Sequence, residues 1–585
     1  MSILQSKSHD FASRYAAMQA REQQRWQHLL DDGIENWADR FEQIADQRGE
    51  YVLVQEVGQD RVWSYRDLDQ AADKIAAWAR HTDAASIGVC QNNGAVFLAT
   101  VLGLAKAGIP AVLFNTHEPA QRLALLAEHA QLKFMVGLAI EGLAVQSPNA
   151  LVAQPWPGRI CTEKRRSVKL DDPVVIIFTS GTSGPSKPAL FSHRRLIGAG
   201  IAWALRNNFN AKTRCYIPLP LCHGNGLAVA FASCVEAGGC AVVRERFSVH
   251  SFIADIRRYH CNSTVYVGEL WSYLMNTPAQ ADDADNPLQV IFGNGLSAEL
   301  WPAVIQRFGI SHVVEHFGAT EMPAAALTNW FDVHGYCGYI PPLHPDAADV
   351  LLVDEAGKPV PVGVAGQALL RVSGGRYRGY LNPAMDVEKL WPGLLEPDDL
   401  WWKSGDILRR DASGFFSFVE RSGDNFRWKG ENISATEVET AIQNTDLVRE
   451  VIVYGITIPG AVGKAGMASV VPKPVWGQTQ LAQLLASLQV QLPSYAVPLV
   501  LRLLPDWHAT TATLKIPKAR FATDGFQDID KYPHFILLAG RYVQLDQERL
   551  MALNTGQLCL GFHPTEKSLS ITTELKTQWL VEETL

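Results

Sequence analysis

The chain has 585 residues, more than a single hydrophobic core organises, so several structural units are expected. Its formal net charge of -8 argues against a protein that binds nucleic acid through a basic surface. The nine cysteines include no pair with C-x-x-C spacing, which argues against a zinc site and favours a reducing, cytoplasmic location.

The N-terminal residues, MSILQSKSHDFASRY, lack the apolar core of a signal peptide. Residues 11–30 place apolar side chains near one helical face, which predicts a helix packed against the body or, alternatively, one lying on a membrane surface. The most apolar stretch, residues 95–114, is interrupted by Lys106, Gly108 and Pro110. We therefore expect a buried helix, a glycine turn and a buried strand there, and at most peripheral contact with the inner face of a membrane.

From about residue 60 to 420, helical patterns alternate with short apolar runs: SYRDLDQAADKIAAWAR is helical and IGVC strand-like, then FLATVLGLAKAG is helical and AVLF strand-like. This order predicts an α/β fold of largely parallel sheets covered by helices. Turn residues at 422–424 mark a junction, and Ser434 can cap a helix because Glu437 follows at the capping-box spacing. We therefore divide the chain into residues 1–421 and a smaller domain, residues 422–585, whose last 30 residues carry no clear signal.

One apolar run leads directly into a loop of small polar residues, VVIIFTSGTSGPSKPALFSH, residues 174–193. Backbone N–H groups in a glycine-rich turn can form an anion-binding nest, hydroxyls add donors, and Lys187 adds a mobile charge. The Walker pattern G-x-x-x-x-G-K-[ST] is not met, because Lys187 follows Ser186 and Pro188 replaces the hydroxyl residue. By itself the stretch is compatible with phosphate binding or with a flexible surface loop.

Four further segments follow in order: EHFGATE (315–321), WWKSGD (401–406), ERSGDNFRWKGENI (420–433) and TATLKIPK (511–518). Together with FTSGTSGPSK they resemble the adenylate-forming superfamily of acyl-CoA synthetases, adenylation domains and luciferases. A narrower resemblance, to the fatty acid transport protein / very-long-chain acyl-CoA synthetase family, covers about residues 60–550. It rests on LPLCHGNGLA, YVGELWSYLMN, FGNGL, GDNFRWKGENISATEVE, GKAGMAS and GRYVQLDQ.

The resemblance implies a large N-terminal domain of packed α/β subdomains and a small, mobile α+β C-terminal domain. It also implies a two-step reaction: a carboxylic acid and ATP give acyl-AMP and diphosphate, and coenzyme A then gives the thioester and AMP. Transfer of AMP to the poorly reactive carboxylate turns its oxygen into part of a good leaving group. The implied acid is a long- or very-long-chain fatty acid, and the implied cofactors are ATP, Mg²⁺ and coenzyme A.

The resemblance assigns the phosphates and the metal to the first two segments. ATP brings about four negative charges toward an anionic acid, so cations and N–H donors must offset the repulsion. Glu321 matches the acidic residue that helps hold Mg²⁺, Thr179 would add an oxygen to the same ion, and Thr320 would face the α-phosphate. The loop over the β- and γ-phosphates would consist of Thr179, Ser180, Gly181, Thr182, Ser183, Gly184 and Lys187.

The nucleoside would be held by residues of several segments. Asp406 would accept hydrogen bonds from the ribose hydroxyls, which suits an acceptor-only carboxylate, and Arg421 would add a donor. Phe317 matches the aromatic residue that stacks on adenine. The nucleotide site would also include His316 and Gly318 beside Phe317, and Gly293, Asn294 and Gly295 as the backbone lining the other side of the base.

The smaller domain would supply a catalytic lysine. Lys515 matches the lysine that reaches the α-phosphate and carboxylate oxygens during adenylation, with Lys518 as the alternative. HATTATLK departs from the family pattern because it lacks the usual glycine. Gly423 matches the hinge of a domain rotation, and Gly430 a place where the pantetheine arm passes close to the backbone.

The acyl pocket is the least specific part of the resemblance. His223 matches a histidine near the acyl entrance, and a core histidine satisfied by the backbone is an equal alternative. Gly268 and Trp271 would line the pocket, whose apolar content suits a hydrophobic acid, although the same residues could be core.

Two other functions stay open at this point. The first is an enzyme that also forms an acyl-AMP but acts on a steroid or bile-type acid, or that transfers the acyl group to a carrier-protein thiol. The other is a lipid-binding or uptake protein with weak catalysis, against which the joint retention of Lys187, Glu321, Asp406, Arg421 and Lys515 argues. A homodimer is compatible with the sequence.

Overall fold

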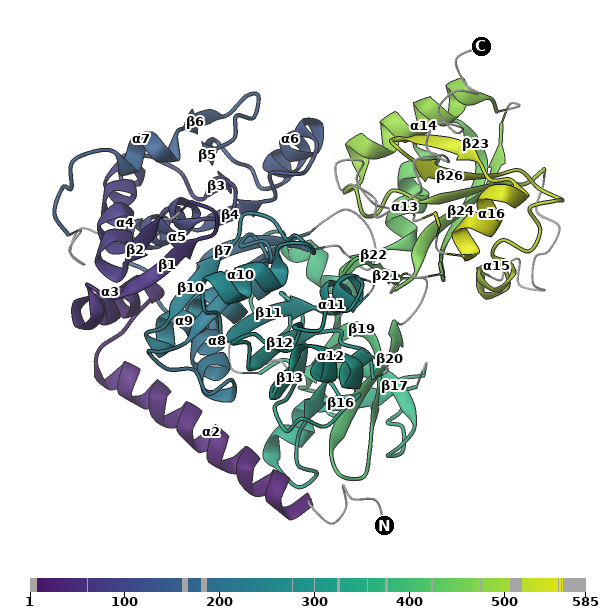
Figure 1. Ribbon diagram of the computed structural model, residues 1–585. Coiled ribbons are helices and arrows are strands. Elements are labelled where there is room, and N and C mark those ends of the chain that lie inside the picture. The colour runs from purple at the N-terminus through teal and green to yellow at the C-terminus, as the bar shows by residue number, and fades with distance from the viewer. Residues whose placement is uncertain are drawn as a thin grey trace. The chain divides into compact units, whose positions relative to one another are not determined.

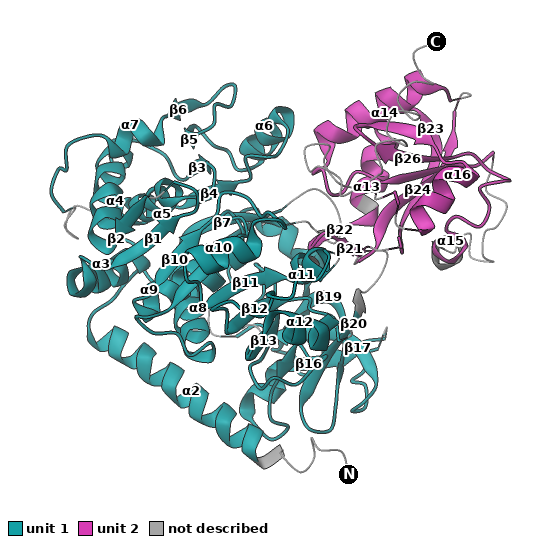
Figure 2. Ribbon diagram, viewed as in Figure 1, with its two compact units in different colours: residues 1–179, 186–422 teal, residues 180–185, 423–585 magenta. Residues whose placement is uncertain are grey.

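The computed structural model describes residues 8–59, 61–159, 167–179, 187–275, 277–298, 300–323, 327–354, 356–373, 377–421, 425–459, 461, 463–473, 476–505, 518–555, 557–558 and 560. The chain divides into two compact units, residues 1–179 with 186–422 and residues 180–185 with 423–585 (Figure 2). The larger unit carries three sheets, and the smaller one carries a five-stranded sheet and a two-stranded ribbon.

The first sheet of the larger unit has the strand order β6-β5-β3-β4-β7-β8 (Figure 1). Its neighbours are parallel except β7 and β8, which are antiparallel. Helices cross over between the parallel strands except between β5 and β6, which a short connection of residues 138–143 joins. The elements are α4 (Tyr65–Ala79), β3 (Ile87–Cys90), α5 (Ala95–Ala107), β4 (Ala111–Phe114), α6 (Ala120–His129), β5 (Phe134–Gly137), β6 (Ala144–Gln146), α7 (Pro148–Val152), β7 (Pro173–Thr179) and β8 (Lys187–Ser192).

The second sheet has the order β14-β13-β12-β11-β9-β10-β1-β2. The six strands from β13 to β1 are mutually parallel, and β14 and β2 pair antiparallel at the two edges. Its strands are β1 (Val52–Glu56), β2 (Val62–Ser64), β9 (Arg214–Ile217), β10 (Cys240–Val243), β11 (Ser263–Val267), β12 (Val290–Asn294), β13 (His312–Phe317) and β14 (Leu327–Asn329). The helices are α3 (Trp37–Arg48), α8 (His193–Arg206), π-helix η2 (Asn225–Phe231), α9 (Ala232–Ala237), α10 (Phe252–Arg258), α11 (Gly268–Met275) and α12 (Leu300–Phe308).

The third sheet is antiparallel, with the order β15-β20-β19-β17-β16 and β18 paired to β19. The adjacent tryptophans Trp401 and Trp402 of β19 are both buried, so both faces of this sheet are covered at that point. Its elements are β15 (Gly338–Tyr339), η3 (Pro345–Asp349), β16 (Val350–Val353), β17 (Ala365–Arg371), η4 (Pro383–Lys389), β18 (Leu390–Pro392), β19 (Leu400–Arg410) and β20 (Phe415–Arg421).

The N-terminal helix α2 (Ser8–Asp31) packs its apolar side chains on the larger unit. The ring of Phe11 lies 5.2 Å from that of Phe331 and 5.3 Å from that of Phe415, centroid to centroid. The hydroxyl of Tyr15 donates a hydrogen bond to Asp346 at 2.8 Å. The interpretation of this helix as packed against the body is therefore confirmed.

The most apolar stretch forms α5 and β4, as predicted, and Gly108 ends the helix with φ +71°. Lys106, inside that helix, is fully buried. Its Nζ lies 2.7 Å from Asp69, 2.7 Å from Asp73 and 3.0 Å from Glu42. The three carboxylates compensate a charge that would otherwise be costly to bury. Among the described residues, no helix is long and apolar enough to cross a membrane.

The smaller unit is built on a sheet of order β23-β24-β25-β26-β27, in which β24 and β25 are parallel. The Ser434 hydroxyl accepts the N–H of Glu437 at 3.2 Å, which confirms the predicted helix start. The elements are β21 (Phe426–Trp428), β22 (Glu431–Ile433), α13 (Ala435–Gln443), β23 (Val448–Ile456), β24 (Ala465–Pro472), α14 (Gln478–Gln491), β25 (Val500–Leu503), α15 (Lys518–Asp524), β26 (His534–Leu538), β27 (Arg541–Gln544) and α16 (Gln547–Asn554). The mixed α/β organisation agrees with the predicted fold class.

Candidate active site

Four of the sequence-predicted segments follow neighbouring parallel strands of the second sheet. The turn with His223 follows β9, Gly268 follows β11, residues 293–295 end β12, and residues 317–321 end β13. These strands are neighbours in the order β13-β12-β11-β9. Because parallel strands share a direction, their carboxyl ends meet at one edge of the sheet, where open α/β sheets bind ligands.

Contacts at this edge join the four segments. The side-chain amide of Asn225 donates to the Asn294 side-chain oxygen at 2.8 Å. A Cβ added to Gly224 would lie 3.9 Å from the Thr320 hydroxyl, so the turn after β9 borders the end of β13. A Cβ on Gly268 would lie 1.8 Å from the carbonyl oxygen of Gly295, so only glycine permits this approach.

The phosphate lysine and the metal carboxylate of the prediction are joined by a tyrosine. Thr179 and Lys187 are register partners in β7 and β8, and the Thr179 hydroxyl donates to the Lys187 carbonyl at 3.4 Å. Tyr380 pairs with Ala189 of β8, and its hydroxyl donates to Glu321 at 3.2 Å. The Lys187 Nζ lies 5.6 Å from the Tyr380 ring centroid. Tyr380 thus connects two segments that carry predicted site residues.

Sequence reasoning does not find Tyr380, because its position depends on the pairing of distant segments. The N–H of Leu190 donates to the carbonyl of Gly379 at 2.9 Å, and the N–H of Leu381 donates to that of Pro188 at 2.8 Å. Through these hydrogen bonds, residues 379–381 run alongside β8. The only sign of it in the sequence is the second of two tyrosines in the turn-rich run RYRGYLNP, residues 376–383.

The electrostatics around Glu321 favour a protonated tyrosine and a charged arginine. Burial raises the pKa of Tyr380, and the Glu321 carboxylate raises it further, so the phenol stays a donor. Burial also raises the pKa of Tyr377, whose hydroxyl donates to Asp386 at 2.6 Å. Burial lowers the pKa of Arg195 to about 10 against the opposing effect of Glu321, so the guanidinium remains charged at neutral pH. Glu321 therefore lies among hydrogen-bond donors and positive charge.

Asp406 lies on β19 in register with Arg421 of β20, in the third sheet. Asp406 is buried, and its backbone N–H donates to the Ser404 hydroxyl at 3.0 Å. The Ser404 hydroxyl thus holds the backbone at this turn. Burial raises the pKa of Cys337, and the charges of Glu315 and Asp406 raise it further.

Comparison with known families agrees with this geometry. Residues 41–381 match the AMP-binding enzyme family, and residues 437–513 match the AMP-binding enzyme C-terminal domain. The first match alone spans more than half of the chain. The chain belongs to the AMP-binding enzymes. All four segments that form the sheet edge lie inside the first match.

Proteins with similar sequences indicate a narrower group within this family. Long-chain fatty acid transport protein 5 of Mus musculus is 33% identical over 497 residues, which cover 76% of this chain and 70% of that protein. A medium/long-chain-fatty-acid–CoA ligase of Mycobacterium tuberculosis is 30% identical over 514 residues, which cover 82% and 84%. The predicted membership of the adenylate-forming superfamily, within the family of fatty acid transport proteins and acyl-CoA ligases, is confirmed.

Solved structures share the fold. An o-succinylbenzoate CoA synthetase of Bacillus subtilis has a TM-score of 0.70 at 20% identity and covers 83% of this chain and 98% of its own. ATP-bound MatB from Rhodopseudomonas palustris has a TM-score of 0.58 at 21% identity, with 85% and 100% covered. The predicted large N-terminal and small C-terminal domains are thus those of adenylate-forming enzymes.

Several predicted residues of this AMP-binding enzyme lie outside the described part of the chain. They are Ser180–Gly184, Gly423 and Lys515, together with the side chains of Arg421 and Lys518. Gly430, in the smaller unit, has φ +78°, and its carbonyl accepts from the Arg427 Nε at 3.1 Å. This left-handed backbone explains the glycine. The assigned roles of all these residues stay predictions.

The predicted acyl-pocket residues occupy different surroundings. Trp271 is fully buried, with ring centroids 5.7 Å from Phe252, 6.0 Å from Tyr266 and 5.6 Å from Phe308. His223 is half-buried in the turn before η2. Trp271 is therefore part of an aromatic core cluster just behind the sheet edge, and its contact with an acyl chain stays a prediction.

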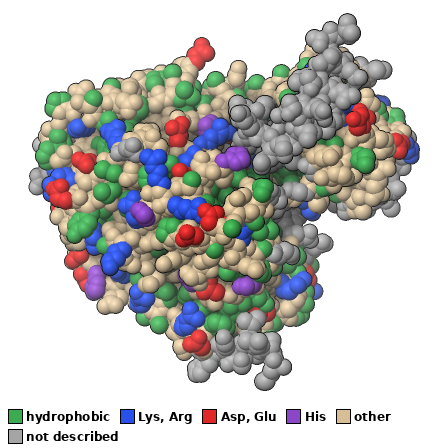
Figure 3. Space-filling model, in the orientation of Figure 1, with side chains coloured by type: hydrophobic (Ala, Val, Ile, Leu, Met, Phe, Trp, Pro, Cys, Tyr) green, Lys and Arg blue, Asp and Glu red, His purple; other side chains and the backbone are tan. Residues whose placement is uncertain are grey.

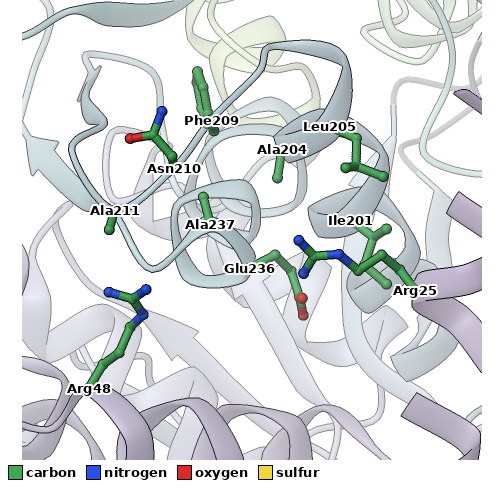
Figure 4. Close-up of a pocket in the computed structure, with 10 residues that line it drawn as sticks. All are labelled: Arg25, Arg48, Ile201, Ala204, Leu205, Phe209, Asn210, Ala211, Glu236 and Ala237. Carbon is green, nitrogen blue, oxygen red and sulfur yellow. The ribbon is translucent and has the colours of Figure 1, made fainter. Parts of the chain in front are cut away.

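A separate cavity of about 340 Å³ lies among α2, α3, α8 and α9. Figure 4 shows Arg25 and Arg48 reaching it from different helices, with Ile201 and Ala237 also on its wall. Its one carboxylate, Glu236, is already paired with Arg40, Nη2 to Oε2, at 2.7 Å. The cavity is lined by other elements than the sheet edge, and none of its lining residues is a sequence-predicted site residue.

The surface has a mixed charge pattern. On the face in Figure 3, basic and acidic side chains of the described residues lie interspersed with apolar and neutral ones. This matches 52 basic and 60 acidic residues over the whole chain. The predicted cytoplasmic location, peripheral membrane contact and homodimer stay predictions.

Proposed function

We propose that this protein is an ATP-dependent acyl-CoA ligase that activates a long- or very-long-chain fatty acid as its acyl-AMP and then transfers the acyl group to coenzyme A. AMP and diphosphate are the other products. Family membership carries the proposal, together with the Lys187–Tyr380–Glu321 arrangement at the sheet edge. The names of the relatives, long-chain fatty acid transport protein and medium/long-chain-fatty-acid–CoA ligase, support the choice of acid.

The phosphates require positive charge because ATP and the acid repel each other. Lys187 begins β8 with its side chain over the Tyr380 ring and its Nζ 3.7 Å from Glu388. In this role Lys187 exchanges that carboxylate for the β- and γ-phosphates and guides the departing diphosphate. Thr320, at the end of β13, would face the α-phosphate.

The residues around Glu321 fit a magnesium ion. Mg²⁺ prefers carboxylate and other hard oxygen ligands, and it usually binds through one or two protein groups plus substrate phosphates. Tyr380 donates to Oε1 of Glu321, and no residue in the described part of the chain bonds to Oε2. Thr179 would add its hydroxyl oxygen. The ion would supply charge neutralisation between the carboxylate and the phosphates.

The nucleoside would be held by residues of four strands, β12, β13, β19 and β20. Phe317 would stack on adenine, with His316 and Gly318 beside it, and residues 293–295 would line the other side. Asp406 would accept from the ribose hydroxyls, and Arg421, its register partner, would donate to them.

The second half of the reaction would use the smaller unit. Lys515 would stabilise charge at the α-phosphate and carboxylate oxygens during adenylation. Rotation of the smaller unit about Gly423 would then remove Lys515 and bring Gly430 to the path of the pantetheine arm. A catalytic lysine on a mobile unit thus separates the two half-reactions in time.

One experiment tests the activity directly. The purified full chain is incubated with ATP, Mg²⁺ and a panel of acids, with and without coenzyme A, and products are identified by mass. We expect acyl-AMP from long-chain acids and the acyl-CoA when coenzyme A is added. Absence of acyl-AMP with every acid would contradict the ligase. A preference for a steroid acid, or adenylate without thioester, would replace the proposed acid or acceptor.

A substitution tests the division of labour between the half-reactions. Lys515→Ala should strongly reduce acyl-AMP formation yet spare thioester formation from supplied acyl-AMP. Lys531→Ala, an exposed lysine of the same unit, is the matched control and should change neither rate. Equal loss of both half-reactions in Lys515→Ala would contradict domain alternation.

A further inference from the structure

Three neighbouring strands place one residue each at the same level of the eight-stranded sheet. Tyr266 of β11 is in register with Gly293 of β12, and Gly293 is in register with Glu315 of β13. Register partners project to the same face of a sheet. Gly293 has no side chain, and a Cβ added to it would lie 2.9 Å from Cγ of the Tyr266 ring. The glycine therefore leaves the space in which the two flanking side chains can meet.

The tyrosine and the glutamate do meet there. The Tyr266 hydroxyl donates a hydrogen bond to Oε2 of Glu315, and the two residues are 0% and 3% exposed. The other carboxylate oxygen, Oε1, accepts the backbone N–H of Gly295 and, at 3.3 Å, that of Leu296. One buried carboxylate thus receives three donors, one from β11 and two from the segment that follows β12.

The segment after β12 needs such an acceptor. The strand ends at Asn294, and Gly295 turns the chain out of the sheet with φ +88°. Backbone N–H groups that leave a strand ladder inside the protein must find another acceptor. Glu315 supplies it, and Asn225 holds the same segment from the other side through the Asn294 side chain.

We propose that Glu315 is a positioning residue for the nucleotide: it sets the path of residues 293–296, and Tyr266 orients its carboxylate. The proposal rests on the proposed function, in which residues 293–295 line the adenine. A well-packed apolar pair would fill the same space with a smaller desolvation cost. The buried carboxylate is accounted for by the backbone donors that it holds, and those donors belong to the wall of the site.

The test compares three variants of the full chain. Glu315→Gln keeps the size of the side chain but loses its charge, and Tyr266→Phe removes the hydroxyl that orients it. Tyr216→Phe is the matched control, because Tyr216 of β9 is also buried in this sheet and donates to a carboxylate, Asp255, at 2.8 Å. Calorimetric titration measures the Kd for AMP and for inorganic tripolyphosphate, which lacks adenine. Thermal unfolding and the adenylation rate are measured on the same samples.

We expect Glu315→Gln to raise the Kd for AMP about tenfold, the value of one hydrogen bond to a charged group. Tyr266→Phe should raise it by a smaller factor, and tripolyphosphate binding should stay at the wild-type value in both. A Kd for AMP that is unchanged, or that changes as in Tyr216→Phe, would overturn the proposal and leave Glu315 a purely structural residue. An equal rise in the Kd for tripolyphosphate would overturn the proposal as well.

The outcome is separable from the proposed function. A wild type that binds AMP but forms no acyl-AMP would refute the ligase activity, while the Kd ratios would still decide the role of Glu315. A wild type that binds neither AMP nor ATP would refute both. If Glu315→Gln does not fold, Tyr266→Phe alone decides, since it leaves the carboxylate and the hydrogen bonds from both backbone N–H donors in place.

Discussion

Removal of the Tyr380 hydroxyl should weaken adenylation through Glu321. The hydroxyl donates to Oε1 of Glu321 at 3.2 Å, and the Tyr380 ring faces the Lys187 ammonium with 5.6 Å between centroid and Nζ. Tyr380→Phe deletes the donor and keeps the ring. The carboxylate is then free to turn away from the position in which it would hold Mg²⁺.

The bond length sets the expected magnitude. A hydrogen bond to a charged group is worth about 1.5–3 kcal/mol. The observed 3.2 Å is long for a hydroxyl donor, so the lower end of this range applies. A loss of about 1.5 kcal/mol corresponds to a fall of about tenfold in kcat/KM.

The assay is ATP–pyrophosphate exchange with a long-chain acid at several Mg²⁺ concentrations. Tyr380→Phe should show the lower kcat/KM and should need more Mg²⁺ for half-maximal rate. Tyr377→Phe is the control, because Tyr377 donates to Asp386 at 2.6 Å rather than to Glu321. Wild-type kcat/KM and Mg²⁺ dependence in Tyr380→Phe would refute the positioning of Glu321 by this hydroxyl. A loss shared equally by both variants would point to general disturbance of the 377–386 segment.

Three further predictions follow from buried contacts. Lys106→Met removes the buried cation that three carboxylates share, of which Asp69 keeps Arg159 at 3.1 Å, and should lower the free energy of unfolding by about 3–5 kcal/mol, measured by urea denaturation; an unchanged midpoint would contradict the network. Burial lowers the pKa of His193 to about 4 from an unfolded value of about 6.5, and the neutral ring accepts the Trp37 N–H. The stability that this neutral ring contributes is fully present above pH 6.5. It is lost as the pH falls toward 4, by about 1.4 kcal/mol per pH unit. His193→Gln should therefore lose less stability than wild type between pH 7 and pH 5, and parallel pH profiles would refute this. Gly268→Ala should displace the Gly295 carbonyl, 1.8 Å from the new Cβ, and reduce adenylation, and an alanine enzyme with wild-type rate would show that this close approach is not required.

The segments of the site are predictable because their residues stand directly after strands or at a strand start. Residues 317–321 end β13, residues 293–295 end β12, and Lys187 begins β8. A pattern of apolar run followed by glycine, hydroxyl or charge is local, and it can be read without knowing which strands are neighbours. The same local reading explains why the α5–β4 stretch is recognised as a helix, a turn and a strand.

The environment of Trp271 cannot be predicted from the local sequence pattern. An apolar, aromatic helix start after β11 is compatible with a pocket wall and with a core, since both bury the same surface. The choice depends on which rings surround the tryptophan, and these come from residues 252, 266 and 308, contributed by separate elements. Tyr380 escapes prediction for the same reason, because its partner Ala189 is distant in the sequence.

The role of Glu315 follows from the register of three strands and not from the EHFGATE motif alone. EHFGATE draws attention to its aromatic and acidic end, and its first residue gains a role only when β11, β12 and β13 are aligned. The alignment also gives Gly293 a second reason to be glycine, because a side chain there would displace the Tyr266 ring. Gly293→Ala would therefore disturb both the adenine wall and the tyrosine–glutamate contact and could not separate them. Glu315→Gln leaves the glycine in place and alters only the acceptor, so it is the substitution that distinguishes a lining segment from the residue that holds it.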